Sequence, residues 1–177
     1  MPRLPRPLSC FHKIHWQALH LVVQQLPLGM RTWRLKFASG CPLCGAPNEK
    51  ASHVLSCPDA GATAKAMTFH STTVRDHLQG CDTHPDLLTL IPKLLLCIQA
   101  GTPVCLHLQP AAVSPALRSQ AATGWHNFPI SQWSVDWFCL QHKHCLSAGS
   151  QKSALCWLSS TLGMLIQGQW HLWDFCN

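Results

Sequence analysis

The stretch CPLCGAPNEKASHVLSCP, residues 41–58, contains the most informative pattern in this sequence. Cys41 and Cys44 are separated by two residues, His53 follows after eight more, and Cys57 follows after another three. A Cys-x-x-Cys pair can direct both sulfurs at one ion across a tight turn, and Gly45 tolerates the backbone conformation that such a turn requires. We therefore predict one metal site with four protein ligands.

The second half of this site is predicted to lie on a short helix. His53 and Cys57 are four residues apart, which places both side chains on one face of a helix, about one turn apart. Three thiolates and one imidazole complete the tetrahedral set that zinc prefers, and they leave no position open for water or substrate. The pattern thus predicts a structural zinc ion and not a catalytic one.

The cysteine pattern has two other interpretations besides a zinc site. Cys41 and Cys44 could form a redox pair, but a redox Cys-x-x-Cys is typical of a thioredoxin-like βαβ unit, which this sequence does not show. The four residues could also be unrelated buried thiols and a surface histidine. Zinc is preferred because the loop between the ligand pairs has almost no apolar side chains. Such a loop needs a metal, contributing about 10 kcal/mol or more, to hold it together.

Outward from this stretch, the apolar spacing predicts a mainly α fold, in which a small zinc knuckle is followed by a helical region. Helical periodicity and Gly or Pro stop signals predict helices over residues 13–25, 60–79, 86–99, 116–127, 131–145 and 153–175. The last of these has an apolar stripe that should face the core: Ala154, Leu158, Thr161, Leu165 and Trp173.

The same patterns divide the chain into six segments. A proline-rich lead-in, expected to be poorly ordered, covers residues 1–9. The remaining segments are an N-terminal helix with a basic-aromatic stretch (10–37), the knuckle (38–60), helices (61–102), a linker (103–115) and a tryptophan-rich helical region (116–177). One ordinary core plus a small module fits a chain of 177 residues.

The composition favours an intracellular protein with acidic partners. Lys and Arg outnumber Asp and Glu by 13 to 7, a formal charge of +6, although only 11% of residues are charged. This balance is compatible with RNA or DNA as a partner. We find no secretory signal and no apolar run of the ~20 residues that cross a bilayer. The eleven cysteines are therefore expected to be reduced, in a soluble protein of the cytoplasm or nucleus.

Residues 41–58 also resemble part of a known family. Their ligand pattern, with Glu49 and Pro58, is similar to the zinc-binding module near the C-terminal end of retrotransposon reverse-transcriptase polyproteins of protist and algal type. The resemblance extends to ALRSQAATGWHNF at 116–128, QWSVDWFCLQ at 132–141 and QWHLWDFCN at 169–177, which look like the helical region that follows this module. It implies that the four predicted ligands hold zinc.

The chain departs from that family in three respects, one of which is that only Ala38, Ser39 and Gly40 separate the Lys-Phe segment from the first ligand cysteine, where the family has more residues. Polymerase chemistry needs carboxylates that hold two metal ions, and no two of the seven Asp and Glu are adjacent, so polymerase activity is not expected. Cys139, Cys156 and Cys176 stand where Arg or another polar residue would be expected. These departures favour a truncated or decayed copy.

Three further patterns support weaker hypotheses. RTWRLKF, residues 31–37, interleaves cations and aromatic rings as single-strand binders do, but an amphipathic strand or helical turn with its aromatics in the core explains the same pattern. His142, His144 and Cys145 could begin a second metal site, although no partner pair stands at a suitable distance. The tryptophans could stack on bases, but their place near the apolar stripe favours core or interface positions.

Two hypotheses about function follow, and neither includes an enzyme. In the first, the chain is an accessory nucleic-acid-binding element for RNA, with phosphate contacts from Arg31, Arg34, Lys36, Lys50, Lys65 and Arg75. In the second, the chain is a non-functional or purely structural fragment. Zinc then clamps its helices together, and the tryptophan-rich helices dock on another protein domain.

Overall fold

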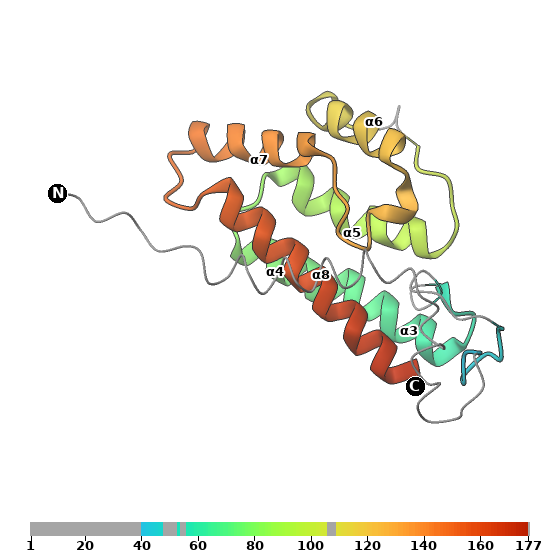
Figure 1. Ribbon diagram of the computed structural model, residues 1–177. Coiled ribbons are helices and arrows are strands. Elements are labelled where there is room, and N and C mark those ends of the chain that lie inside the picture. The colour runs from blue at the N-terminus through green and yellow to red at the C-terminus, as the bar shows by residue number, and fades with distance from the viewer. Residues whose placement is uncertain (1–39, 48–52, 54–55, 106–108, 177) are drawn as a thin grey trace.

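A computed structural model of the chain describes residues 40–47, 53, 56–105 and 109–176 (Figure 1). Within these residues every regular element is a helix and no strand occurs, so the predicted mainly α class is confirmed. The Cys-Cys-His-Cys cluster precedes the helices, as predicted. The predicted helix over 13–25 and the basic-aromatic stretch over 31–37 lie outside the described residues. None of the described helices is long and apolar enough to cross a membrane.

The first long helical stretch agrees with the helix predicted over 60–79 and contains a π-helical turn. Its parts are α3 (Ala60–Thr68), the π turn η2 (Phe69–Thr73) and α4 (Val74–Gly80). In the π turn the Val74 amide donates to the Phe69 carbonyl, five residues back. Such a turn inserts one extra residue into an α-helix and so changes which side chains face each neighbour.

Four further α-helices follow along the chain, and a short 3-10 turn stands on each side of α6. The elements are α5 (Pro85–Gln99), the 3-10 turn η4 (Ala111–Val113), α6 (Ser114–Thr123), the 3-10 turn η5 (Trp125–Asn127), α7 (Val135–Ser147) and α8 (Ala154–Cys176). The helices predicted over 86–99 and 153–175 match α5 and α8 to within one residue at each end.

The boundaries around α6 and α7 differ from the prediction. The segment 103–115, predicted as a linker, already ends in helix, because Pro115 fits the first turn of α6, where no amide hydrogen bond is lost. The predicted helix over 116–127 is two elements, because Gly124 interrupts it with a φ of +101°. α7 begins at Val135 and not at 131, because Ser131 has a left-handed φ of 67° that a helix does not allow.

Helices on both sides of residues 106–108 contribute to one hydrophobic core. Its buried members before this segment include Val74, Leu78, Leu87, Ile91 and Leu95, and its buried members after it include Leu117, Phe128, Trp137, Trp157 and Leu165. In the predicted α8 stripe, Ala154, Thr161 and Leu165 are buried, and Leu158 and Trp173 are half-buried. Trp137 and Trp157 are therefore core residues of this chain.

Two fully buried glutamines tie these elements together. The Gln120 Oε1 accepts hydrogen bonds from the Trp137 indole at 3.1 Å and from the Ser134 amide at 3.0 Å, which fixes α6 against the start of α7. Gln141 of α7 accepts from the His84 amide and donates to the Asp82 carbonyl, both at 2.9 Å. Each amide side chain thus satisfies buried polar groups that packing alone would leave unpaired.

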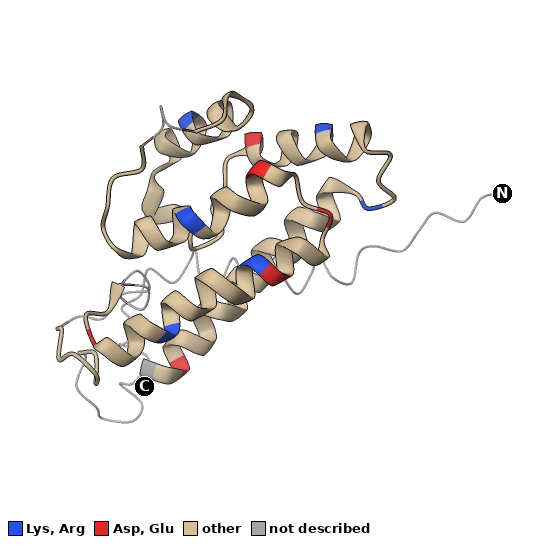
Figure 2. Cartoon of the chain, turned by 180° about the vertical axis from the view of Figure 1, so that it is seen from behind, with Lys and Arg blue, Asp and Glu red and all other residues tan. Residues whose placement is uncertain are grey.

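α8 lies alongside α3 and α4 (Figures 1 and 2). Between them, Phe69 of η2 packs against Gly168 of α8, where an added Cβ atom would lie 1.8 Å from the Phe69 Cζ. That distance is far inside van der Waals contact, so only glycine at this position admits the Phe69 ring. The π turn and Gly168 together therefore set how α8 packs.

We expect Gly168→Ala to destabilise the fold by about 1–3 kcal/mol, because the added methyl group overlaps the Phe69 ring. Gly80→Ala is the matched control. Gly80 is also helical, and a Cβ atom added there would meet no heavy atom within 4 Å, so this change should be neutral or stabilising by up to about 1 kcal/mol. Urea denaturation followed by circular dichroism measures both, and equal stabilities for the two variants would contradict this packing.

Candidate metal centre

The first two ligands lie on a tight turn that residues 40–46 form. The Gly45 amide donates to the Cys41 carbonyl at 2.8 Å, and the Cys41 amide donates to the Ala46 carbonyl at 2.9 Å. Gly45 has a φ of 72°, in the left-handed region that the sequence pattern predicted for this position. The turn directs the sulfurs of Cys41 and Cys44 to the same side as His53 and Cys57.

The four predicted ligands converge closely enough to hold one metal ion. Their donor atoms all lie within 4.8 Å of one another. The Sγ atoms of Cys41 and Cys57 are 3.9 Å apart, and the Cys44 Sγ lies 3.2 Å from the His53 Nε2. Around a tetrahedral zinc, sulfur pairs would be separated by roughly 3.8 Å and a sulfur–nitrogen pair by roughly 3.6 Å. The donor set therefore fits an ion of this size.

The cluster is attached to the first turn of α3. The Thr63 hydroxyl donates to the Cys57 carbonyl at 2.9 Å, and Ala62 packs in one buried cluster with Cys41 and Cys57. The Asp59 carboxylate, two residues after the last ligand, accepts from the amides at 61 and 62 and so caps the start of α3. Sequence reasoning missed the role of Thr63, because a threonine in a helix gives no signal of what its hydroxyl will contact.

The protein environment acts differently on two of the thiols. Burial raises the pKa of the Cys57 thiol to about 12, so this thiol is protonated at neutral pH when no ion is bound. A backbone hydrogen bond at Ala46 lowers the pKa of the Cys44 thiol. Since a thiol must lose its proton to bind a metal, affinity should increase as the pH is raised.

A second metal site at His142, His144 and Cys145 finds no support. The His142 ring stacks on Phe138 at 5.6 Å, the His144 Nε2 lies 3.9 Å from the Asp82 carboxylate, and Cys145 is buried beside Gln141. In the part of the chain that the structure describes, the four-residue cluster is the one group of three or more ligands positioned for an ion.

Only two of the predicted nucleic-acid contacts fall within the described residues. Lys65 and Arg75 are exposed on α3 and α4. Arg31, Arg34, Lys36 and Lys50 lie outside the described residues. The Lys and Arg residues of the described helices are scattered among Asp residues and form no continuous basic stripe (Figure 2).

Comparison of the chain with models of known protein families, with curated proteins and with solved structures finds no match.

Elemental analysis of the chain, purified under reducing conditions, should find one metal ion per molecule. Cys44→Ser should lose most of the bound metal, because an alcohol is a far poorer ligand than a thiolate. Cys156→Ser is the control, since Cys156 is exposed and outside the cluster, and it should keep the ion. Equal metal content in the two variants would show that the cluster does not hold the ion.

Proposed function

We propose that this chain is a structural zinc module without catalytic activity, and that it serves as an accessory RNA-binding element of retroelement origin. Zinc binding is supported by one observation, which is that the donor atoms of three cysteines and one histidine all lie within 4.8 Å of one another. Four protein ligands fill a tetrahedron and leave no site for a reacting water, so the ion stabilises the knuckle and does not perform chemistry.

The donor chemistry is the argument for zinc over other ions. Sulfur and imidazole ligands in tetrahedral geometry are typical of zinc, whereas calcium and magnesium take oxygen ligands. The identity of the metal in the purified chain tests this assignment directly. Zinc at one ion per chain supports it, and any other element in its place overturns it.

The charge distribution bears on RNA binding. The described residues contain six Lys and Arg and six Asp and Glu, so the helical body has no formal net charge. Residues 1–39 contain six Lys and Arg and no Asp or Glu, which accounts for the whole surplus of +6. The strongest attraction to phosphates is therefore expected from this segment, which includes Arg31, Arg34 and Lys36.

A charge-matched pair of variants tests this proposal. We expect wild type to bind single-stranded RNA with an affinity that falls steeply with salt. Changing Arg31, Arg34 and Lys36 to Gln should reduce the slope of log affinity against log salt by about 2. Changing the exposed Lys93, Arg118 and Lys143 to Gln removes the same charge from the helical body and should leave the slope nearly unchanged. Fluorescence anisotropy at several salt concentrations measures both, and salt-independent or absent binding would refute the RNA role.

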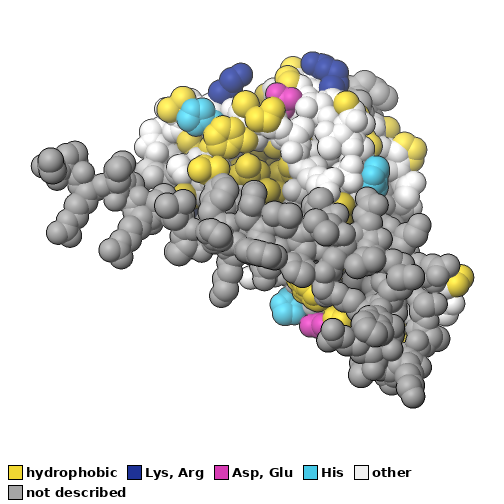
Figure 3. All heavy atoms as spheres, in the orientation of Figure 1, with side chains coloured by type: hydrophobic (Ala, Val, Ile, Leu, Met, Phe, Trp, Pro, Cys, Tyr) yellow, Lys and Arg dark blue, Asp and Glu magenta, His cyan; other side chains and the backbone are white. Residues whose placement is uncertain are grey.

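One observation favours the second candidate function, a protein-interaction fragment. Val135 and Leu146 of α7 are 68% and 69% exposed, and Cys139 between them is also exposed. Residues 135 and 146 are about three helical turns apart, so all three side chains lie near one face. Hydrophobic side chains gather on the surface where α7 and the start of α8 lie (Figure 3). This stripe is a candidate contact for another domain of the same or a neighbouring polypeptide.

If α7 is such a contact surface, the isolated chain should self-associate or bind an apolar dye, and Leu146→Glu should reduce both because it puts a charge into the stripe. Ala122→Glu, at an exposed position of α6, adds the same charge elsewhere and should have no effect. Sedimentation velocity and dye fluorescence give the two readouts. A monomer that binds no dye argues against the interaction role.

A further inference from the structure

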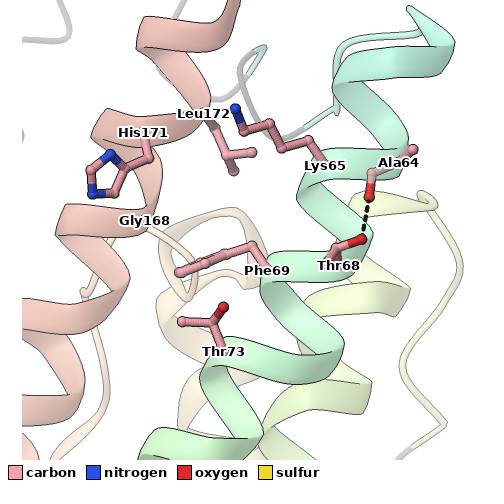
Figure 4. A pocket seen from close by; sticks show the side chains of 8 residues that line it. All are labelled: Ala64, Lys65, Thr68, Phe69, Thr73, Gly168, His171 and Leu172. Carbon is pink, nitrogen blue, oxygen red and sulfur yellow. Dashed lines mark hydrogen bonds between the residues drawn. The ribbon is translucent and has the colours of Figure 1, made fainter.

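A groove of about 480 Å³ separates α3 and η2 from α8 (Figure 4). The side of α3 contributes Ala64, Lys65 and Thr68, all exposed. Phe69, the first residue of η2, reaches across the groove toward Gly168 of α8 (Figure 4). Its ring therefore lies between the two helices, only partly buried, where a bound molecule could contact it.

The α8 side of the groove combines apolar surface with a polar rim. Gly168 and Leu172 are buried and form the wall, while His171 is an exposed lining residue on α8 (Figure 4). No carboxylate is among the described residues that line the groove, so Lys65 gives its rim a positive charge. The Lys65 Nζ lies 4.3 Å from the centre of the Phe175 ring, near the C-terminal end of α8.

These features match a known way of binding single strands. Proteins that bind single-stranded nucleic acid combine cations that contact phosphates with aromatic rings on which bases stack. A volume of about 480 Å³ lies within the range of about 300–1,000 Å³ typical of small-ligand sites. In addition, π-helical turns occur frequently at functional sites, and Phe69 owes its direction to such a turn.

We infer that this groove holds one nucleotide of a bound single-stranded RNA, with the base against the Phe69 ring and the adjacent phosphate at Lys65 and His171. This inference rests on the proposed RNA binding and assigns to it a specific site. Residues 1–39 supply the general attraction to phosphates, and the groove supplies a contact that the neutral helical body would otherwise lack. The groove contact therefore depends less on salt than the rest of the binding.

Affinity for a fluorescein-labelled oligouridine, measured by anisotropy on the zinc-loaded full chain, tests the inference. Phe69→Leu should weaken binding about tenfold, because it removes one stacked base. Ala64→Trp fills the groove from an exposed position that should not affect folding, and it should weaken binding by a similar factor. Lys65→Gln should weaken binding several-fold more than Lys143→Gln, which removes the same charge from the remote and exposed end of α7.

Cross-linking locates the base independently of these variants. An oligonucleotide containing 4-thiouridine should cross-link to the tryptic peptide of residues 66–75, which contains Phe69 and no other groove ring. Cross-links confined to residues 1–39, with unchanged affinity of Ala64→Trp and Lys65→Gln, would overturn the groove assignment and leave the RNA role standing. No binding by the wild-type chain would overturn both.

Discussion

Gln141 makes the hydrogen bonds on which the arrangement of the helices depends. From α7 it bonds the backbone at both Asp82 and His84, in the turn between α4 and α5. The Trp157 indole adds a bond to the Thr83 hydroxyl at 2.8 Å, so α8 is held to the same turn. These bonds connect elements that are more than 50 residues apart in sequence. A buried donor or acceptor that lost its partner would destabilise the fold. The turn between α4 and α5 therefore connects these two helices to α7 and α8.

The four-residue cluster contacts the helices at the first turn of α3. Cys41 and Cys44 lie on a short turn, Ala62 packs against Cys41 and Cys57, and the Thr63 hydroxyl donates to the Cys57 carbonyl. An ion bound by three thiolates has one excess negative charge, which is favourable beside the amide end of a helix. Metal binding should accordingly order the knuckle without changing the core, and the two parts can be perturbed separately.

The sequence was most informative where chemistry or periodicity is local. The spacing of the cysteines and His53 identified four residues that the structure brings together, because residues so close in sequence can meet around one short turn. The bounds of α5 and α8 were predicted closely, because apolar spacing and Gly or Pro stops are local signals. The predicted start of α6 at residue 116 was wrong, because a proline such as Pro115 can either begin a helix or precede one. The break at Gly124 adjoins Gln120, a buried side chain whose amide nitrogen donates to the Gly124 carbonyl at 3.3 Å, and regular helical spacing does not anticipate such a contact.

By itself, the sequence determined a mainly helical chain, a Cys-Cys-His-Cys cluster that could hold a metal ion and a net positive charge, since each follows from residue type and spacing along the chain. Only the tertiary structure decided that Trp137 of α7 and Trp157 of α8 share a core with α4 and α5, that Phe69 meets Gly168, and that a groove opens beside them. The physical reason is that packing joins residues nearly 100 positions apart. No local pattern encodes such contacts, and a π turn redirects side chains in a way that regular helical spacing does not anticipate.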